Sequence, residues 1–198
     1  MIFVREISIM SEISYQEEVQ QQSEYANYIY ENKTIRNTLE HAEQDGNNAE
    51  EYLIRAKNYK REGNELQLRR ACRSATKDAV DSTEKFLKVG ANVKQVQNHT
   101  FLNGRGKRER VQNTHYIRMI SENVGEAWLS NEETEFMDSF IDIENGCYNS
   151  HTGLSYGNVD PTLEEAEKAV EIKRKAENGV KELRNRVYTQ KILHGIRL

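Results

Sequence analysis

The sequence predicts an all-α fold, an elongated helical bundle with long N- and C-terminal helices, and three observations support this prediction. The 198 residues include a single proline, a residue that long helices exclude from their interiors. Hydrophobic residues make up 36% of the chain and charged residues 30%, which suits narrow apolar stripes better than a thick core. Apolar side chains also recur at intervals of three and four residues. We therefore expect four to six helices.

The N-terminal region predicts a short extension followed by a long helix. Residues 1–13 are expected to be mobile or lightly docked. Ser14 and Glu17 form a capping box, which predicts a helix start at this point. The apolar stripe that follows continues to Ala42, and the turn-forming sequence "DGNN" at 45–48 is predicted to end the helix.

Two more amphipathic stretches predict a helical hairpin. The first covers 49–63, and the second follows a strict four-three alternation over three heptads that is rich in small residues, so a partner helix can come close. The stripe of the second stretch is Leu68, Cys72, Ala75, Ala79, Ser82, Phe86 and Val89.

The same region is similar to one helix pair of the tetratricopeptide type. The aromatic and small residues that match its spacing are Tyr52, Ala56, Tyr59, Gly63, Leu68, Cys72 and Ala75. The similarity covers one repeat of about 34 residues, lacks the usual proline and does not recur along the chain. An ordinary helical hairpin is therefore predicted.

Residues 93–118 allow two interpretations. The dipeptide Asn103-Gly104 favours a tight turn and predicts a short β-hairpin near 96–112. Alternatively, a loop leads into a helix that spans 117–128, with Trp128 packed on its apolar face. The second interpretation is narrowly favoured.

The last third of the chain predicts a short helix, a long loop and a final helix. A capping box at Ser130 and Glu133 predicts a short helix through Ile141, which closes a helical domain over 14–144. A loop with three glycines follows at 145–160.

Asp160 and Pro161 are suited to the N-cap and the first turn of the final helix. This helix, predicted over 161–195, is expected to pack on the helical domain or on another subunit.

Charge is distributed unevenly along the chain, although the formal net charge is only −4. Residues 1–54 contain 3 basic and 11 acidic side chains, and residues 55–119 contain 16 basic and 6 acidic ones. Residues 120–167 contain no basic and 12 acidic side chains, and residues 168–198 contain 9 basic and 3 acidic ones. Three interpretations are open: the segments pair with one another, the basic segment binds nucleic acid or another polyanion, or the acidic segment binds a protein partner.

The basic segment supplies the candidate polyanion site. If a helix began at Lys107, its first turn would carry cations that the helix dipole disfavours, so an anion would bind there or the helix would start later, with Asn113 as N-cap. Gly104 and Gly106 let backbone amides approach a phosphate, while the rings of His115 and Tyr116 are suited to base stacking. The predicted polyanion-binding residues are Arg69, Arg70, Arg73, Arg105, Lys107, Arg108, Arg110 and Arg118.

The acidic segment and the loop after it supply the candidate protein-binding site. Its predicted residues are Glu132, Glu133, Glu135, Asp138, Asp142, Tyr148 and Tyr156. In the same region Cys147 and His151 lie four residues apart, but the sequence lacks further ligands at zinc spacing and an electropositive setting for a thiolate. We therefore predict no metal, no cofactor and no catalytic residue.

The sequence predicts a cytoplasmic protein without a membrane span. Cys72 and Cys147 are too few for a disulfide framework, so reduced thiols are expected. The first ten residues interleave charged and apolar side chains, unlike a secretory signal, and no run of about 18 apolar residues occurs.

The favoured function is a non-enzymatic protein–protein interaction protein, expected to be a homo-oligomer because its narrow stripes leave helix faces that one chain can hardly bury. The composition suits a phage or mobile-element protein that binds host machinery, or a virion component. The alternative function is nucleic-acid binding by the basic segment 55–119.

Overall fold

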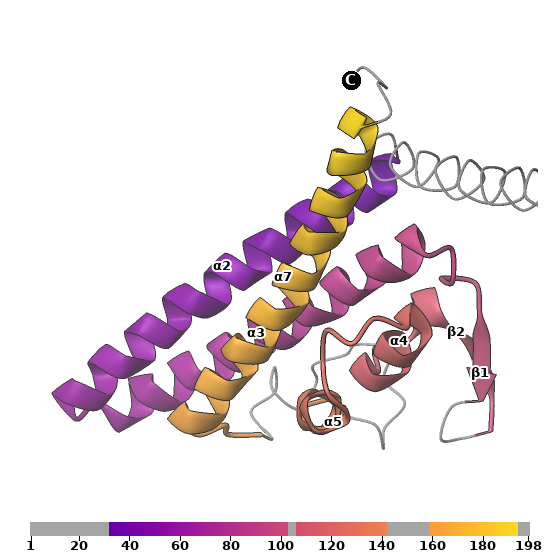
Figure 1. Cartoon of the computed structure of the whole chain (residues 1–198). Helices are drawn as coiled ribbons and strands as arrows, with labels where there is room; N and C mark the ends of the chain where they lie inside the picture. Colours follow the sequence, from indigo (N-terminus) through magenta and orange to yellow (C-terminus); the bar gives the residue numbers. More distant parts are fainter. Residues whose placement is uncertain (1–31, 103–105, 142–158, 194–198) are drawn as a thin grey trace, which may run out of the picture.

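Two long antiparallel helices, α2 and α3, form the body of the structure, and a third long helix, α7, packs against both (Figure 1). The computed structural model describes residues 32–102, 106–141 and 159–193. In this part of the chain the helices are α2 (Lys33–Glu62), α3 (Glu65–Val93), α4 (Ile117–Val124), α5 (Asn131–Asp138) and α7 (Leu163–Leu193), with a 3-10 turn η1 (Val111–Asn113). Strands β1 (Thr100–Leu102) and β2 (Arg108–Arg110) pair in an antiparallel hairpin. The predicted helical fold with a short hairpin is therefore confirmed.

Helix α2 begins and ends at clear local signals. The side chain of Asn32 accepts hydrogen bonds from the backbone N–H groups of Thr34 (2.9 Å) and Ile35 (3.2 Å). At the other end Gly63 has a left-handed φ of 70°, which a residue without a Cβ adopts readily. The helix start predicted at Ser14 and the extension before it lie outside the described residues.

The predicted end of this helix at 45–48 is wrong, because α2 continues through it. Gly46 lies where α2 crosses both other long helices. A Cβ on Gly46 would be 3.0 Å from Ser82 Oγ of α3 and 3.2 Å from Lys173 Nζ of α7. Ala42, one turn earlier, is fully buried and accepts a hydrogen bond from the Ser82 hydroxyl (2.7 Å). The turn-forming sequence therefore serves as a point of close helix approach.

A buried lysine joins α2 and α7 beside this crossing. The side chain of Lys173 is only 2% exposed, and its Nζ donates to Glu50 (2.9 Å) and to Glu177 (3.1 Å). Hydrogen bonds from Arg174 and Lys173 lower the pKa of Glu50 to about 2. The buried ammonium is thus satisfied by two carboxylates, as burial of a charge requires.

Helix α7 begins at Leu163, two residues later than predicted. Thr162, not Asp160, provides the cap: its Oγ1 accepts the Glu165 N–H (3.2 Å), and the Glu165 carboxylate accepts the Thr162 N–H (2.7 Å). Asp160 forms an ion pair with Arg73 of α3 instead.

Trp128 docks the short helices on the long ones. The helix predicted over 117–128 ends at Val124, and the hairpin and this helix occur together, although the sequence favoured only the helix. Trp128 therefore lies in the loop between α4 and α5 and packs against the core, as predicted. Its ring fits against Gly90 of α3 and Gly179 of α7, where an added Cβ would lie within 2.7 and 2.4 Å of it.

The capping box that begins α5 is confirmed. Ser130 Oγ accepts the Glu133 N–H (3.2 Å) and Glu133 Oε2 accepts the Ser130 N–H (2.8 Å). The helix ends at Asp138, three residues earlier than predicted. The predicted loop at 145–160 lies outside the described residues except for its last two positions. Within the described ranges, no helix has the length and apolarity needed to cross a membrane.

Candidate functional site

The β-hairpin presents one outward face, which we call the hairpin face and define as Thr100, Leu102, Arg108 and Arg110. Thr100 pairs with Arg110 and Leu102 with Arg108, so the four side chains share one side of the two-stranded sheet. All four are exposed, and Leu102 has 69% of its surface accessible. The hairpin lies at the margin of the described structure, with α4 between it and the long helices (Figure 1).

The opposite face anchors the hairpin. Phe101, on the inner side of β1, packs against the core. The pairing of the two chain segments continues beyond the strands, because the N–H of Val111 donates to His99 O and that of Gln112 donates to Gln97 O, both at 3.0 Å. Val111 is fully buried. The hairpin face is therefore held on a fixed support.

Asp138 connects the segment after the hairpin to α5. Its carboxylate accepts the backbone N–H of Ile117 (2.6 Å) and that of Arg118 (3.1 Å), so it caps the start of α4 from another helix. Burial raises the pKa of Asp138 to about 6, against the opposing effect of these hydrogen bonds. The residue at the N-cap of α4 is Tyr116, not the predicted Asn113.

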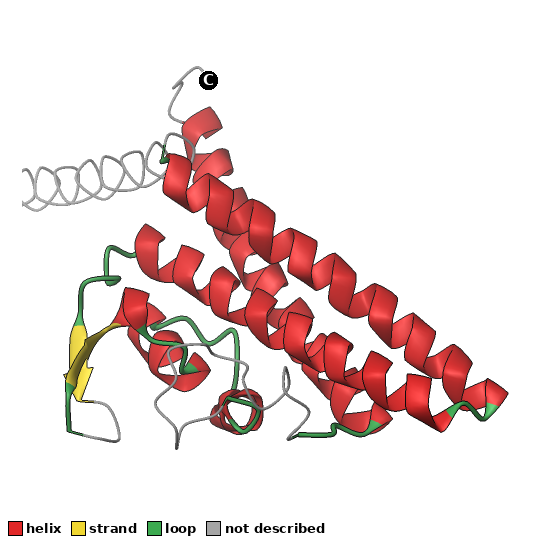
Figure 2. Cartoon of the chain, turned by 180° about the vertical axis from the view of Figure 1, so that it is seen from behind, coloured by secondary structure: helices red, strands yellow, loops and turns green. Residues whose placement is uncertain are grey.

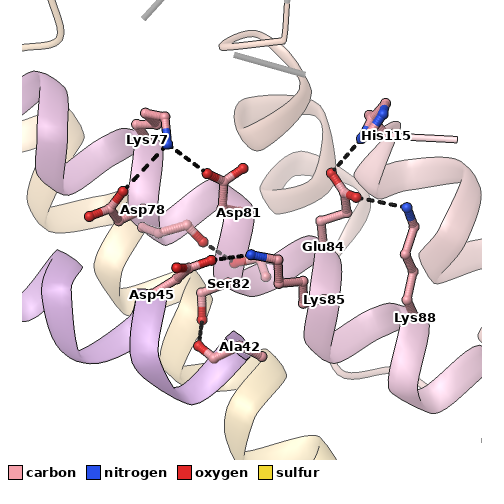
Figure 3. A network of polar contacts seen from close by, with 12 residues as sticks. Ala42, Asp45, Lys77, Asp78, Asp81, Ser82, Glu84, Lys85, Lys88 and His115 are labelled. Carbon is pink, nitrogen blue, oxygen red and sulfur yellow. Dashed lines mark hydrogen bonds and ion pairs between the residues drawn. The ribbon is translucent and has the colours of Figure 1, made fainter. Parts of the chain in front are cut away.

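A buried carboxylate fixes the same segment to α3. Glu84 accepts a hydrogen bond from Lys88 Nζ (2.7 Å) and lies 2.9 Å from His115 Nδ1, as Figure 3 shows. Burial of Glu84 would raise its pKa, but the contacts with His115 and Lys88 lower it below the ordinary value. His115 therefore makes an internal contact with Glu84, while its ring stays partly exposed.

The predicted polyanion residues divide into two groups at opposite ends of α3. Arg69 and Arg70 are exposed near its beginning, while the hairpin follows its end, about 35 Å of helix away. Neither these two arginines nor Arg108 and Arg110 of the hairpin make an ion pair within the described residues, but Arg108 and Arg110 lie on one face of a hairpin whose opposite face packs on the core. The hairpin is therefore the candidate site.

The other members of the predicted polyanion set differ in their surroundings. Arg73 pairs with Asp160, and Arg118 pairs with Glu122 and with Glu135 (2.8 and 2.9 Å). Lys107 is exposed, and Arg105 lies outside the described residues.

The predicted protein-binding carboxylates are mostly engaged within the chain. Glu133 caps α5 and pairs with Lys175, Glu135 pairs with Arg118, and Asp138 caps α4. Glu132 is exposed. The remaining predicted residues, Asp142, Tyr148 and Tyr156, lie outside the described ranges.

Ion pairs connect the acidic and basic segments of the sequence. Within the described residues, those that involve carboxylates of 120–167 are Lys57–Glu167, Arg73–Asp160, Lys94–Glu126, Arg118–Glu122, Arg118–Glu135, Lys175–Glu133 and Arg186–Glu126. Such contacts are expected if the acidic and basic segments pair with one another, the first of the three interpretations of the charge distribution. Exposed pairs each contribute only about 0 to 1 kcal/mol, so they influence how the helices fit together more than they stabilise the fold.

A second polar cluster lies between α2 and α3 (Figure 3). Lys77 pairs with Asp81 (2.9 Å) and more distantly with Asp78 (3.7 Å), and Lys85 pairs with Asp45. Burial raises the pKa of Asp78 to about 6, and the nearby carboxylates of Asp45 and Asp81 add to this rise. The Lys85–Asp45 pair links α3 to α2, whereas Lys77, Asp78 and Asp81 all belong to α3.

The described residues contain no group of three or more His, Cys, Asp or Glu side chains that could hold a metal ion. A cavity of about 480 Å³ lies between the α2–α3 turn and the start of α7. Cys72 lines this cavity, but burial raises the pKa of its thiol, which disfavours the reactive thiolate. Cys147 and His151 lie outside the described residues.

Two residues of the hairpin face, Thr100 and Leu102, were not singled out by the sequence. The signal that finds them is the turn dipeptide Asn103-Gly104 together with the alternation of side chains along paired strands. No protein-family model, curated protein or solved structure matches this chain. The function must therefore be argued from the site itself.

Proposed function

We propose that this protein is a non-enzymatic nucleic-acid-binding protein that binds its ligand through the hairpin face. One observation carries the proposal: Arg108 and Arg110 lie side by side on an exposed strand, without a carboxylate partner among the described residues. Arg73 and Arg118, in contrast, each pair with an acidic residue.

An unpaired arginine pair on a fixed support is suited to nucleic-acid binding. Guanidinium groups form two parallel hydrogen bonds to paired acceptors such as phosphate oxygens or the O6 and N7 atoms of guanine, and their attraction is strongest where no internal carboxylate competes. Phe101 and Val111 hold the strands against the core, so little order has to be gained on binding. Each phosphate contact releases counterions and makes the affinity fall with salt.

Fluorescence anisotropy with labelled DNA and RNA at salt concentrations between about 50 and 200 mM tests the proposal. The wild type is expected to bind with an affinity that falls steeply with salt. Arg108→Ala with Arg110→Ala is expected to weaken binding across this range of salt concentration.

Arg69→Ala with Arg70→Ala is the matched control, because it removes the same charge from two exposed arginines at the other end of α3. This control is expected to leave the affinity close to that of the wild type. Equal losses in the two double variants would mean that net charge, not the hairpin face, determines binding. No binding at 50 mM salt would overturn the proposal.

A protein partner is the second candidate, and two exposed aliphatic side chains favour it. Ile54 of α2 is 61% exposed and Leu66 of α3 is 60% exposed. A host protein or a second copy of this chain could cover them. Sedimentation at increasing concentration and a pull-down with Ile54→Asn and Leu66→Asn variants test this candidate, which predicts that these variants lose the association.

The two candidates are compatible in one protein. A homo-oligomer would present two hairpin faces to one nucleic acid, as dimeric binding proteins do. A phage or mobile-element protein in the host cytoplasm, or a virion component, would meet both nucleic acid and host proteins.

A further inference from the structure

We infer that the preferred ligand of the hairpin face is B-form duplex DNA, contacted in the major groove at guanines two base pairs apart. This inference rests on the proposed function and specifies its ligand class. Three properties of the hairpin carry it: the width of the sheet, the spacing of its arginines and the kinds of side chain on its outward face.

The width of the hairpin matches one groove. Paired strands lie about 4.8 Å apart, and a two-stranded ribbon with its side chains fits the major groove of B-form DNA, about 12 Å wide. The minor groove, about 6 Å wide, is too narrow, and the major groove of A-form RNA is deep and narrow. Figures 1 and 2 both show β1 and β2 at the margin of the described chain, where a duplex can approach them.

The arginine spacing matches the rise of the duplex. Arg108 and Arg110 are two residues apart on β2, which separates their Cα atoms by about 6.6 to 6.8 Å. Successive bases on one strand of B-form DNA rise by about 3.4 Å, so this distance corresponds to two base-pair steps. Arginine bound to the O6 and N7 atoms of guanine is the commonest specific contact in this groove. Two guanines separated by one base pair therefore fit the two side chains.

The composition of the hairpin face disfavours single strands. Proteins that bind single-stranded nucleic acid stack bases on exposed aromatic rings, and Thr100, Leu102, Arg108 and Arg110 include none. The aromatic ring of β1 belongs to Phe101, which faces inward and packs against the core. Leu102, across from Arg108, supplies the kind of apolar surface that contacts a thymine methyl group.

A competition experiment with the full-length protein tests the inference. A labelled duplex with the pattern G-N-G is displaced by unlabelled competitors of the same length: the same duplex, its two separated strands, duplex RNA, and the duplex with 7-deazaguanine, which lacks the N7 acceptor. The same duplex is expected to compete at least about fivefold better than each of the others.

A charge-preserving variant separates base contacts from phosphate contacts. Arg108→Lys with Arg110→Lys keeps both positive charges but loses the planar guanidinium. It is expected to bind the duplex at low salt and to show a smaller difference between guanine and 7-deazaguanine than the wild type, because an ammonium donates to the guanine edge without the fork geometry of a guanidinium.

The outcomes separate this inference from the proposed function. Equal competition by single strands, by duplex RNA or by the 7-deazaguanine duplex would overturn the inference and leave nucleic-acid binding in place. No binding to any nucleic acid would overturn both. A preference for the unmodified duplex that is as large in the Arg108→Ala, Arg110→Ala double variant as in the wild type would also contradict the inference, because the arginines would then not contact the guanines.

Discussion

The indole ring of Trp128 lies directly against Gly179 of α7, so closely that a Cβ on Gly179 would come within 2.4 Å of two ring atoms. The same ring meets Gly90 of α3, where an added Cβ would lie 2.7 Å away. A single side chain in the loop between α4 and α5 therefore fits two long helices, and each helix provides a glycine for it. This contact positions α5, whose Asp138 caps the helix that follows the hairpin.

Gly179→Ala is expected to lower the free energy of unfolding by about 1–3 kcal/mol, the usual cost of overpacking. A decrease in the free energy of unfolding would be evidence for the contact with the ring, because alanine in a helix interior is ordinarily about 1 kcal/mol more favourable than glycine. Urea unfolding followed by the fluorescence of Trp128, the single tryptophan, measures the change. Asn178→Ala, at an exposed neighbouring position, should change the stability by less than about 0.5 kcal/mol. A Gly179→Ala variant as stable as the wild type would show that the ring does not occupy this place.

Gly46→Val tests the crossing of the three long helices. The new side chain would meet Ser82 and Lys173, so the free energy of unfolding should fall by about 1–3 kcal/mol or more. Asn47→Val places the same β-branched residue on the exposed side of α2 and serves as the control. Thermal unfolding monitored by circular dichroism compares the two variants. Valine is more favourable than glycine in a helix interior, so a Gly46→Val variant as stable as Asn47→Val would show that the crossing does not limit the space at this position.

Lys173 should tolerate methionine better than alanine. Its side chain is only 2% exposed, so Lys173→Ala removes buried packing and is expected to cost about 2–4 kcal/mol. Lys173→Met keeps most of the volume, and Glu50 and Glu177 retain Arg174 and Lys181 as partners. The methionine variant should therefore lose less stability in chemical unfolding near neutral pH. Equal losses would mean that the ammonium, not the packing, carries the effect.

Asp78→Asn is expected to make the protein more stable near neutral pH. The folded state raises the pKa of Asp78 to about 6, so between about pH 4 and 6 it holds a proton that the unfolded chain releases. Stability contributed by this group therefore falls as pH rises through that window. Asparagine avoids the buried charge and should gain about 1 kcal/mol at about pH 7.5, with the gain disappearing near pH 4.

Chemical unfolding of both proteins at the two pH values checks this prediction. Asp81→Asn removes an ion pair with Lys77 (2.9 Å) and should show no such gain. The prediction fails if Asp78→Asn is less stable than the wild type at pH 7.5.

Local signals in the sequence predicted local structure well. The capping box of Ser130 and Glu133 occurs as predicted, because it depends only on hydrogen bonds within one turn. The short hairpin was also recognised from a local signal, the dipeptide Asn103-Gly104, although a loop leading into the helix at 117 was favoured in its place. Helix ends that depend on distant residues were missed, as at 45–48, where the close contact of Gly46 with α3 and α7 keeps α2 continuous.

Charge along the sequence predicted the candidate site only in part. The partners of two predicted arginines lie far away in the chain: Arg73 pairs with Asp160 and Arg118 pairs with Glu135. No local pattern reveals such pairs. The length of α3 likewise separates Arg69 and Arg70 from the hairpin, although a single basic segment contains them all.

Photo-crosslinking to duplex DNA shows whether the hairpin face contacts the nucleic acid. A photoreactive amino acid is placed in turn at Leu102, Ile54 and Leu66, the three large apolar side chains that are well exposed in the described part of the chain. Binding through the hairpin face is expected to give a crosslink to the duplex from position 102 that is lost at high salt, and none from the other two positions. A crosslink from position 54 or 66 with none from position 102 would place the nucleic-acid contact at the α2–α3 end of the molecule and rule out the hairpin face.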